Sequence, residues 1–274
     1  MIHETIDLKT HFPDLAETAS LTSYVQDVSD EIDPADRRIT VLVCPGGGYQ
    51  YTTDREAEPI ALAFMAKRVN AFVLRYSCEP SRYPTALSQA AASVAYIRRN
   101  CGVYHAHPDK IAVIGFSAGG HLAACIGTLW NDEILRPYLG NAFGHNRPDA
   151  MVLCYAVTLW GEKGHASSYK LLLGDAPAGA YERLSLEKRV SASTPPAFIW
   201  HTVDDYGVPV ENALYMADSL QRNGVSFELH VYTRGGHGLA LGNDMTLAKG
   251  HPEQDNPHAA TWFNLCCDWL KATL

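Results

Sequence analysis

The stretch Val113-Ile-Gly-Phe-Ser-Ala-Gly-Gly120 decides the fold of this chain, because it has the pattern of a buried strand that turns sharply into a helix. The apolar run Ile111-Ala-Val-Ile114 leads into Gly115-x-Ser117-x-Gly119, and a segment of small residues, 121–127, leads out of it. A turn this tight needs glycine on both sides of the serine, since a side chain there would collide with the neighbouring strand or helix. Ser117 is then held at the tip of the turn. This context favours a nucleophile over the alternative, an ordinary turn between a strand and a helix.

Apolar runs of strand length alternate with helical patterns along most of the chain. We predict strands over 39–44, 70–76, 111–114, 151–155, 197–201 and 226–232, and helices over 54–68, 84–99, 210–222 and 257–270. Because the strands are apolar almost throughout, they indicate a mostly parallel sheet with helices on both faces. Two stretches with alternating polarity, 5–8 and 21–28, predict edge strands or hairpins, and residues 107–110 predict a turn.

The domain organisation follows from length and regularity. A chain of 274 residues without an internal repeat or a low-complexity linker fits a single α/β domain over residues 1–274. The least regular part, residues 157–194, is rich in glycine. We interpret it as a small cap or lid inserted over the C-terminal edge of the sheet.

Charge and cysteine usage narrow the class of function. A net charge of −8 with no cluster of Lys or Arg argues against binding to nucleic acid. The seven cysteines are scattered and several lie in apolar runs, so we expect buried thiols in a reducing compartment. No C-x-x-C pair indicates a metal site, and no apolar run is long enough to span a membrane. The N-terminal residues lack the pattern of a secretory signal, which predicts a cytoplasmic protein.

A serine nucleophile requires a base within hydrogen-bond reach, and this base is best a histidine held in one tautomer by a carboxylate. In an open parallel sheet these groups gather at the C-terminal ends of the strands, in the order Ser, Asp or Glu, His. His237 lies in the glycine-rich turn after the strand that ends at Tyr232. Asp204 and Asp205 follow the strand that ends at His201. The residues alone leave the choice between these two aspartates open.

The oxyanion of an acyl-transfer reaction needs N–H donors that are already in position. Pro45-Gly-Gly-Gly-Tyr49, after an early strand, offers backbone amides without side chains, and the amide of Ala118 opens the helix after the serine. A phosphate-binding loop is the alternative for the three glycines. The following Gly-Lys-Ser/Thr of a Walker loop and the third glycine of a dinucleotide fingerprint are both missing.

These motifs together resemble the α/β-hydrolase esterases and lipases. The matching stretches are 45–49, 115–124, His201-Thr-x-Asp-Asp-x-x-Val-Pro-Val210 and Gly235-Gly-His-Gly238. The most similar subgroup is that of the acetyl esterase and acetylxylan-esterase-like proteins, of the BD-FAE type. Pro45 stands where the hormone-sensitive-lipase branch has a histidine, which places the chain off that branch.

The resemblance implies an α/β-hydrolase fold and assigns roles to individual residues. Ser117 would be the nucleophile and His237 the base. The acid would be Asp205, three residues before Val208-Pro. The oxyanion donors would be the amides of Gly47, Gly48 and Ala118.

The expected function is a serine carboxylesterase that removes short acyl groups, acetyl above all, from sugars or oligosaccharides. Its partner would be a small-molecule ester, and no cofactor is implied. Tyr49 and Trp160 are candidates for a wall that faces the sugar, with a role in the apolar core as the alternative. An amidase, formamidase or peptidase of the same fold is a second reading, and a non-catalytic binding module a third. The sequence leaves the oligomeric state open, a homo-oligomer included.

Overall fold

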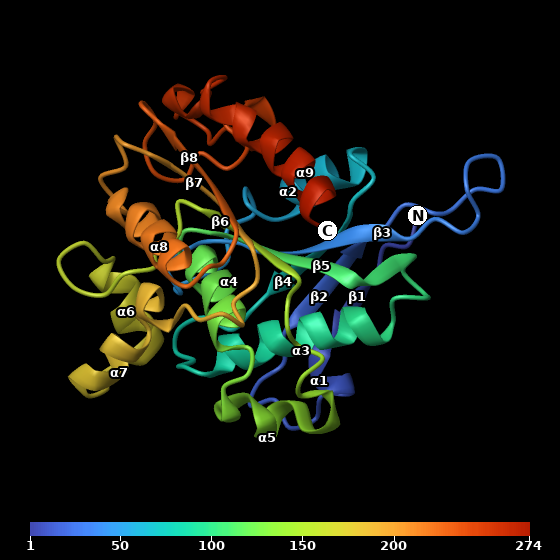
Figure 1. The fold of residues 1–274 in the computed structure, drawn as a ribbon, viewed down its shortest axis with the longest axis horizontal. Helices are drawn as coiled ribbons and strands as arrows, with labels where there is room; N and C mark the ends of the chain where they lie inside the picture. Colours follow the sequence, from blue (N-terminus) through green and yellow to red (C-terminus); the bar gives the residue numbers. More distant parts are fainter.

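An eight-stranded sheet runs through the molecule in the order β1-β2-β4-β3-β5-β6-β7-β8. The computed structural model describes residues 1–274 (Figure 1). The strands are β1 (Thr5–Asp7), β2 (Ser20–Tyr24), β3 (Arg38–Cys44), β4 (Asn70–Arg75), β5 (Ala106–Phe116), β6 (Ala150–Cys154), β7 (Ala197–Thr202) and β8 (Phe227–Tyr232). Strands β3 to β8 are parallel to one another, whereas β2 pairs antiparallel with both β1 and β4.

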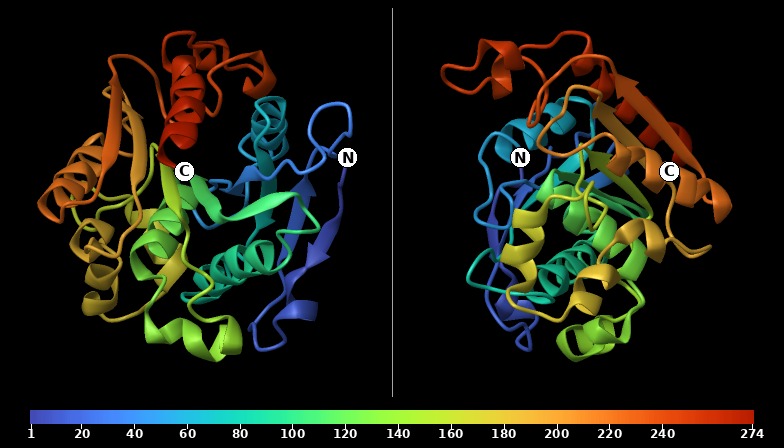
Figure 2. Two further views of the ribbon diagram at one scale, coloured as in Figure 1. Left: turned by 45° about the vertical axis from the view of Figure 1, so that its right-hand side comes forward. Right: turned by 90° about the vertical axis from the view of Figure 1, so that its left-hand side faces the viewer.

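Helices connect the parallel strands and cover both faces of the sheet. The helices are α1 (Leu8–His11), α2 (Glu58–Ala66), α3 (Thr85–Arg99), α4 (Ala118–Leu129), α5 (Arg136–Leu139), α6 (Ala166–Leu173), α7 (Ala178–Arg183), α8 (Glu211–Arg222) and α9 (Trp262–Thr273). Helices α2 and α9 lie on one face, and α3, α4 and α8 lie on the other (Figures 1 and 2). The central strands are therefore buried on both sides, which explains why they are apolar almost throughout.

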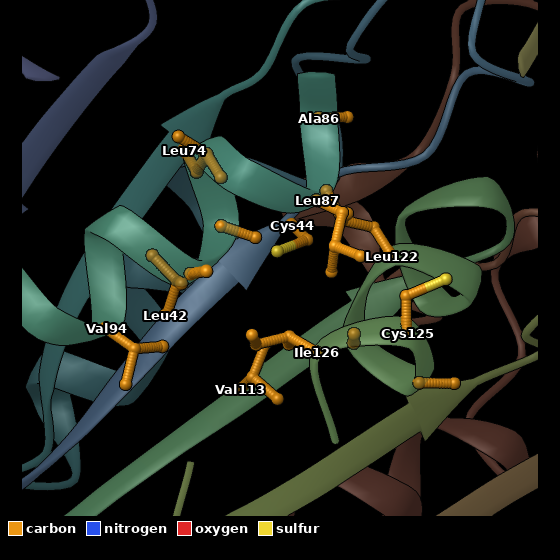
Figure 3. Packing of buried hydrophobic residues seen from close by; sticks show 14 of the residues in the cluster. Leu42, Cys44, Leu74, Ala86, Leu87, Val94, Val113, Leu122, Cys125 and Ile126 are labelled. Carbon is orange, nitrogen blue, oxygen red and sulfur yellow. The ribbon is translucent and has the colours of Figure 1, made fainter. Parts of the chain in front are cut away.

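Each face of the sheet has its own apolar core. Under α9, the rings of Trp200 and Trp262 stack with their centroids 5.1 Å apart. On the opposite face, Leu122 and Ile126 of α4 pack over Leu42 and Val113 of the sheet (Figure 3). The small residues of α4 let its backbone approach the sheet closely. A methyl group at Gly120, for example, would lie 2.5 Å from Cβ of Ala156.

The predicted sharp turn lies between β5 and α4. Ser117 has φ 53° and ψ −118°, a backbone conformation that is strained for any residue with a side chain. Both positions that flank Ser117 require glycine, because a side chain there would overlap backbone atoms. A methyl group at Gly115 would lie 2.0 Å from the carbonyl oxygen of Gly119, and one at Gly119 would lie 2.1 Å from the carbonyl oxygen of Cys44. The turn therefore holds the serine at the C-terminal edge of β5, beside the end of β3.

Residues 157–194 contain α6, α7 and the 3₁₀ helix Leu186–Arg189. This segment lies beside α4 and α8 in Figure 1. It is tied to the rest of the chain by a backbone contact, since the Tyr83 amide donates to the Leu172 carbonyl at 2.9 Å. The Arg82 guanidinium donates to the carbonyl of Leu171 in α6 at 2.9 Å.

The predicted strands and long helices are present, and the differences lie at their ends. Residues 107–110 do not form a separate turn before the strand, as predicted, because they belong to β5 and form an irregularity within it. Arg38 pairs with Ala106, yet Thr40 pairs with Ile111, so β5 carries extra residues that β3 does not match. The helix predicted from residue 257 begins with the 3₁₀ turn Ala259–Thr261 and becomes an α-helix only at Trp262. The short helices α1 and α5 were not predicted.

Substitution of Gly119 by alanine tests the contact between the turn and β3. We expect Gly119→Ala to lower the free energy of unfolding by at least about 2 kcal/mol, because the new methyl group meets backbone atoms that cannot rotate away. Gly102→Ala is the control, since a methyl group there meets nothing within 4 Å. It should change stability by less than about 1 kcal/mol. Equal stabilities of the two variants in urea denaturation would contradict this account.

Candidate active site

Three side chains from distant parts of the chain form one line of hydrogen bonds. His237 Nε2 lies 2.7 Å from Ser117 Oγ, and His237 Nδ1 lies 2.7 Å from Asp205 Oδ2. Asp205 lies on the loop after β7, and His237 lies on the loop after β8. An ionised carboxylate only accepts hydrogen bonds, so the Asp205 contact keeps the proton of His237 on Nδ1. Nε2 is then free to accept the proton of the Ser117 hydroxyl.

Asp205 is fully buried, and its surroundings keep it ionised. Burial opposes its charge, but hydrogen bonds from His201 and His237 outweigh that cost and hold the pKa of the carboxyl well below its usual value. Its Oδ1 accepts from the amides of Gly207 at 2.9 Å and Val208 at 2.8 Å. His201 Nε2 lies 3.4 Å from Oδ2 and donates to the Val208 carbonyl at 2.8 Å, which orders the loop.

The structure separates the two aspartates that the residues alone left open. Asp204 points away from the histidine, and its Oδ2 pairs with Arg234 at 3.1 Å near the surface. Asp205, in contrast, has no exposed side-chain area and contacts the His237 ring directly. Only Asp205 is placed to orient that ring.

The loop after β3 presents free amides beside Ser117. Gly47 and Gly48 have φ values of 128° and 67°, which glycine adopts readily, and neither amide donates a hydrogen bond within the protein. Ala118 is the first residue of α4, so its amide has no partner inside the helix. These three N–H groups are the candidates for an oxyanion hole. The amide of Gly46 is not available, because it donates to Glu56 Oε2 at 2.8 Å.

Ser117 and His237 line a cleft of about 360 Å³. The lining is mostly polar, and Tyr51 and Leu171 are its two apolar residues. The other lining residues are Gly47, Gly48, Gln50, Thr53, Arg55, Glu56, His165, Ser167 and Gly238. His165, Ser167 and Leu171 come from residues 157–194, so this segment forms part of the cleft wall. Burial, and to a lesser extent the nearby His237, lower the pKa of His165.

Sequence reasoning missed most of this wall. His165 and Ser167 lie in the segment predicted as a cap, but its irregular pattern does not indicate which of its side chains face Ser117. Arg55 and Glu56 fall at the predicted start of a helix, where charged residues usually face solvent. The one available hint is their position shortly after the three glycines.

Tyr49 and Trp160, considered above for a wall that faces the sugar, do not line this cleft. Tyr49 is buried in the core, and Trp160 packs against the rings of Tyr169 and Tyr181 with centroids 5.1 and 4.5 Å away. Both aromatic rings are therefore used for packing, which was the alternative role for them. The ring of Tyr169 in turn meets the His121 ring of the nucleophile helix, with centroids 5.2 Å apart.

His121, four residues after the serine, packs beneath the turn. Its Nε2 donates to the Leu184 carbonyl at 3.2 Å, so Nδ1 accepts the hydroxyl of Tyr49 at 2.8 Å. Complete burial lowers the pKa of this histidine to about 4. His121 thus links the glycine loop, α4 and the segment 157–194 as a neutral side chain.

No group of three or more His, Cys, Asp or Glu is placed to hold a metal ion. All seven cysteines are free thiols. None of the helices combines the length and the apolar character that crossing a membrane requires.

The fold and this site together define a class. A serine on a sharp turn between a strand and a helix, with a histidine and an aspartate supplied by later loops of a mostly parallel sheet, is the arrangement of the α/β-hydrolases. The chain belongs to the BD-FAE family, which residues 33–220 match. The resemblance seen in the sequence and the predicted fold class are both confirmed.

Known proteins and solved structures agree with this assignment. Endo-1,4-beta-xylanase B of Butyrivibrio fibrisolvens is 36% identical over 214 residues, which are 76% of this chain but 33% of that protein. The chain therefore spans about a third of that relative's length. The acetyl ester-xyloside bifunctional hydrolase of Caldicellulosiruptor lactoaceticus superposes with a TM-score of 0.82 at 34% identity, over 98% of this chain and 96% of the other. The carboxylesterase Cest-2923 of Lactobacillus plantarum gives a TM-score of 0.85 at 30% identity, over 99% and 98%. The two solved structures, which cover nearly the whole chain, agree with a hydrolase of the carboxylesterase class.

The buried histidine predicts a specific dependence of stability on pH. The pKa of His121 is about 4 in the folded protein and about 6.5 when unfolded, so the unfolded chain binds one more proton between these values. Stability due to this residue is complete above pH 6.5 and falls by about 1.4 kcal/mol per pH unit down to pH 4. We expect His121→Gln to remove this part of the slope, as measured by urea denaturation over pH 4–7.

The exposed His145, whose side chain makes no hydrogen bond, supplies the control. The His145→Gln variant should keep the slope of the wild-type protein. A slope that is unchanged in His121→Gln would show that the folded protein accepts a proton at this buried ring.

Proposed function

We propose that the chain is a serine carboxylesterase that removes short acyl groups, acetyl above all, from sugars and related polyhydroxylated alcohols. One observation carries the proposal. The line of hydrogen bonds from Asp205 through His237 to Ser117 ends at the cleft, and free backbone amides lie beside the serine. This arrangement supports acyl transfer through a covalent intermediate.

The proposed reaction begins when Ser117 Oγ attacks the ester carbonyl and its proton passes to His237 Nε2. Asp205 stabilises the imidazolium that forms, and the amides of Gly47, Gly48 and Ala118 donate hydrogen bonds to the developing oxyanion. The tetrahedral intermediate collapses, and the alcohol leaves with the proton from His237. A water molecule, deprotonated by His237, then attacks the acyl-enzyme and releases the carboxylic acid and the free serine.

The lining of the cleft supports the choice of substrate class. Polar side chains such as Gln50, Arg55 and His165 offer hydrogen-bond partners to an alcohol that carries several hydroxyl groups. Two apolar residues, Tyr51 and Leu171, leave little surface on which to bury a long acyl chain. The names of two relatives, a xylanase and an acetyl ester-xyloside hydrolase, refer to xylose-based compounds and agree with an acetylated sugar.

Activity against 4-nitrophenyl acetate and peracetylated xylose tests the proposal. Wild-type protein should hydrolyse both, with rates that fall as the acyl chain is lengthened to octanoyl. Ser117→Ala should lower turnover by about 10⁴-fold or more, because no other group can form the acyl-enzyme.

Ser167→Ala removes a hydroxyl from the same cleft and should keep turnover within about tenfold, so it serves as the control. Unchanged turnover in Ser117→Ala would sink the proposal. Faster hydrolysis of N-formyl amides or aminoacyl nitroanilides than of esters would replace it with an amidase.

The two aspartates allow a matched comparison. Asp205→Asn should lower kcat by roughly 10²–10⁴-fold, because an amide no longer selects the tautomer of His237 that carries its proton on Nδ1. Asp204→Asn breaks only an ion pair near the surface and should keep kcat within about threefold. The reverse order of the two effects would assign the acid to Asp204.

A further inference from the structure

A buried carboxylate contacts the glycine loop and, through Tyr155, the loop that carries His237. Glu56 precedes α2 and is 3% exposed. No cation pairs with it. Its Oε2 accepts the Gly46 amide at 2.8 Å, and its Oε1 accepts the hydroxyl of Tyr155 at 2.6 Å. Each oxygen of the carboxylate thus has a defined partner, as a buried charge requires.

The Gly46 contact places the glycine loop against the nucleophile turn. A methyl group at Gly46 would lie 2.6 Å from Glu56 Oε2 and 3.1 Å from Cβ of Ser117. Gly46 therefore lies closely between the carboxylate and the serine, with no space for a side chain. The amides of Gly47 and Gly48, the proposed oxyanion donors, follow directly in the chain.

Through Tyr155, the same carboxylate is also connected to the loop that carries His237. The Tyr155 hydroxyl accepts the amide of Ala240 at 3.0 Å, three residues after His237. The ring of Tyr155 also meets the His237 ring edge-on, with centroids 5.1 Å apart. Tyr155 therefore supports the histidine through its ring and the histidine loop through its hydroxyl.

The neighbouring Arg55 acts on the same loop. Its Nη2 donates to the Gly238 carbonyl at 2.9 Å, and its Nε donates to the Thr246 carbonyl at 2.6 Å. Two consecutive residues thus contact both sides of the site. Arg55 binds carbonyls of the histidine loop, and Glu56 binds an amide of the glycine loop and the Tyr155 bridge.

We propose that Glu56 is a positioning residue that holds the oxyanion donors and the base in one common geometry around Ser117. This inference rests on the proposed esterase function. Displacements well below 1 Å in an oxyanion donor are sufficient to weaken its hydrogen bond in the transition state, where these bonds contribute most to the rate. Glu56 acts through Gly46 and Tyr155 and takes no proton from the substrate.

The kinetics of Glu56→Ala test this role. Per active site titrated with a fluorophosphonate, we expect kcat for 4-nitrophenyl acetate to fall about 100-fold, with KM within about threefold of wild type. The affinity for a trifluoromethyl ketone, which forms an oxyanion with Ser117, should fall by a similar factor. Glu58→Ala, two residues away on the exposed side of α2, is the matched control and should change neither quantity.

Two further variants keep the test decisive if Glu56→Ala does not fold. Glu56→Gln retains an acceptor for the Gly46 amide and a donor to the Tyr155 hydroxyl, so its kcat should stay within about tenfold of wild type. Tyr155→Phe breaks the bridge to Ala240 and leaves the ring in place. It should lower kcat about tenfold, and its effect should not multiply with that of Glu56→Ala, since both variants break one chain of contacts.

The results distinguish this inference from the proposed function. If Ser117→Ala abolishes turnover but Glu56→Ala and Tyr155→Phe keep kcat per titrated site within threefold, the positioning role is wrong and the esterase function stands. If Glu56→Ala lowers only the fraction of active sites that can be titrated, and leaves kcat per titrated site unchanged, the inference is also overturned, because Glu56 would then have a role in folding only. If Ser117→Ala leaves turnover unchanged, the function itself fails.

Discussion

The structure depends on a contact between backbones at the turn after β5. Gly119 lies against the carbonyl groups of Cys44 and Pro45, so no atom of a side chain separates the nucleophile helix from the end of β3. This approach brings the serine and the glycine loop to the same edge of the sheet and forces Ser117 into its strained conformation. The strain persists because Gly115 and Gly119 pack on both sides and the parallel sheet holds β3 and β5 in register. Everything else in the site is arranged around this fixed point.

Burial of charge is the second constraint, and the site meets it with hydrogen bonds. Asp205 keeps its charge through two backbone amides and two imidazole rings, and Glu56 keeps its place through one amide and one phenol. Such contacts are directional, so a carboxylate that is satisfied in this way also fixes the loops that supply its donors. The two acids therefore act on geometry as well as on electrostatics.

Local patterns were sufficient to predict the sheet, the connecting helices and the turn at Ser117, because each depends on neighbouring residues and on apolar periodicity. The order of Ser117, Asp205 and His237 along the chain also placed these side chains at strand ends, where the structure brings them together. The cleft wall could not be predicted in the same way. His165 and Glu56 reach the site only through the path of an irregular segment and through a loop that turns back beneath Gly46. Tyr49 is a residue for which local position was misleading. Its place beside the glycine loop suggested contact with a ligand, whereas in the structure its hydroxyl donates a hydrogen bond to His121.

The strand order has a consequence for how the site responds to heat. Ser117 follows a central strand with neighbours on both sides, whereas the loop of His237 follows β8, the last strand of the sheet, which pairs only with β7. Most of β8 is partly exposed, so fewer apolar contacts oppose its local opening. The base thus follows an edge strand, and the nucleophile follows a central one. We expect catalysis to be lost reversibly on warming before the sheet melts, as the histidine leaves a serine that still sits in its folded turn.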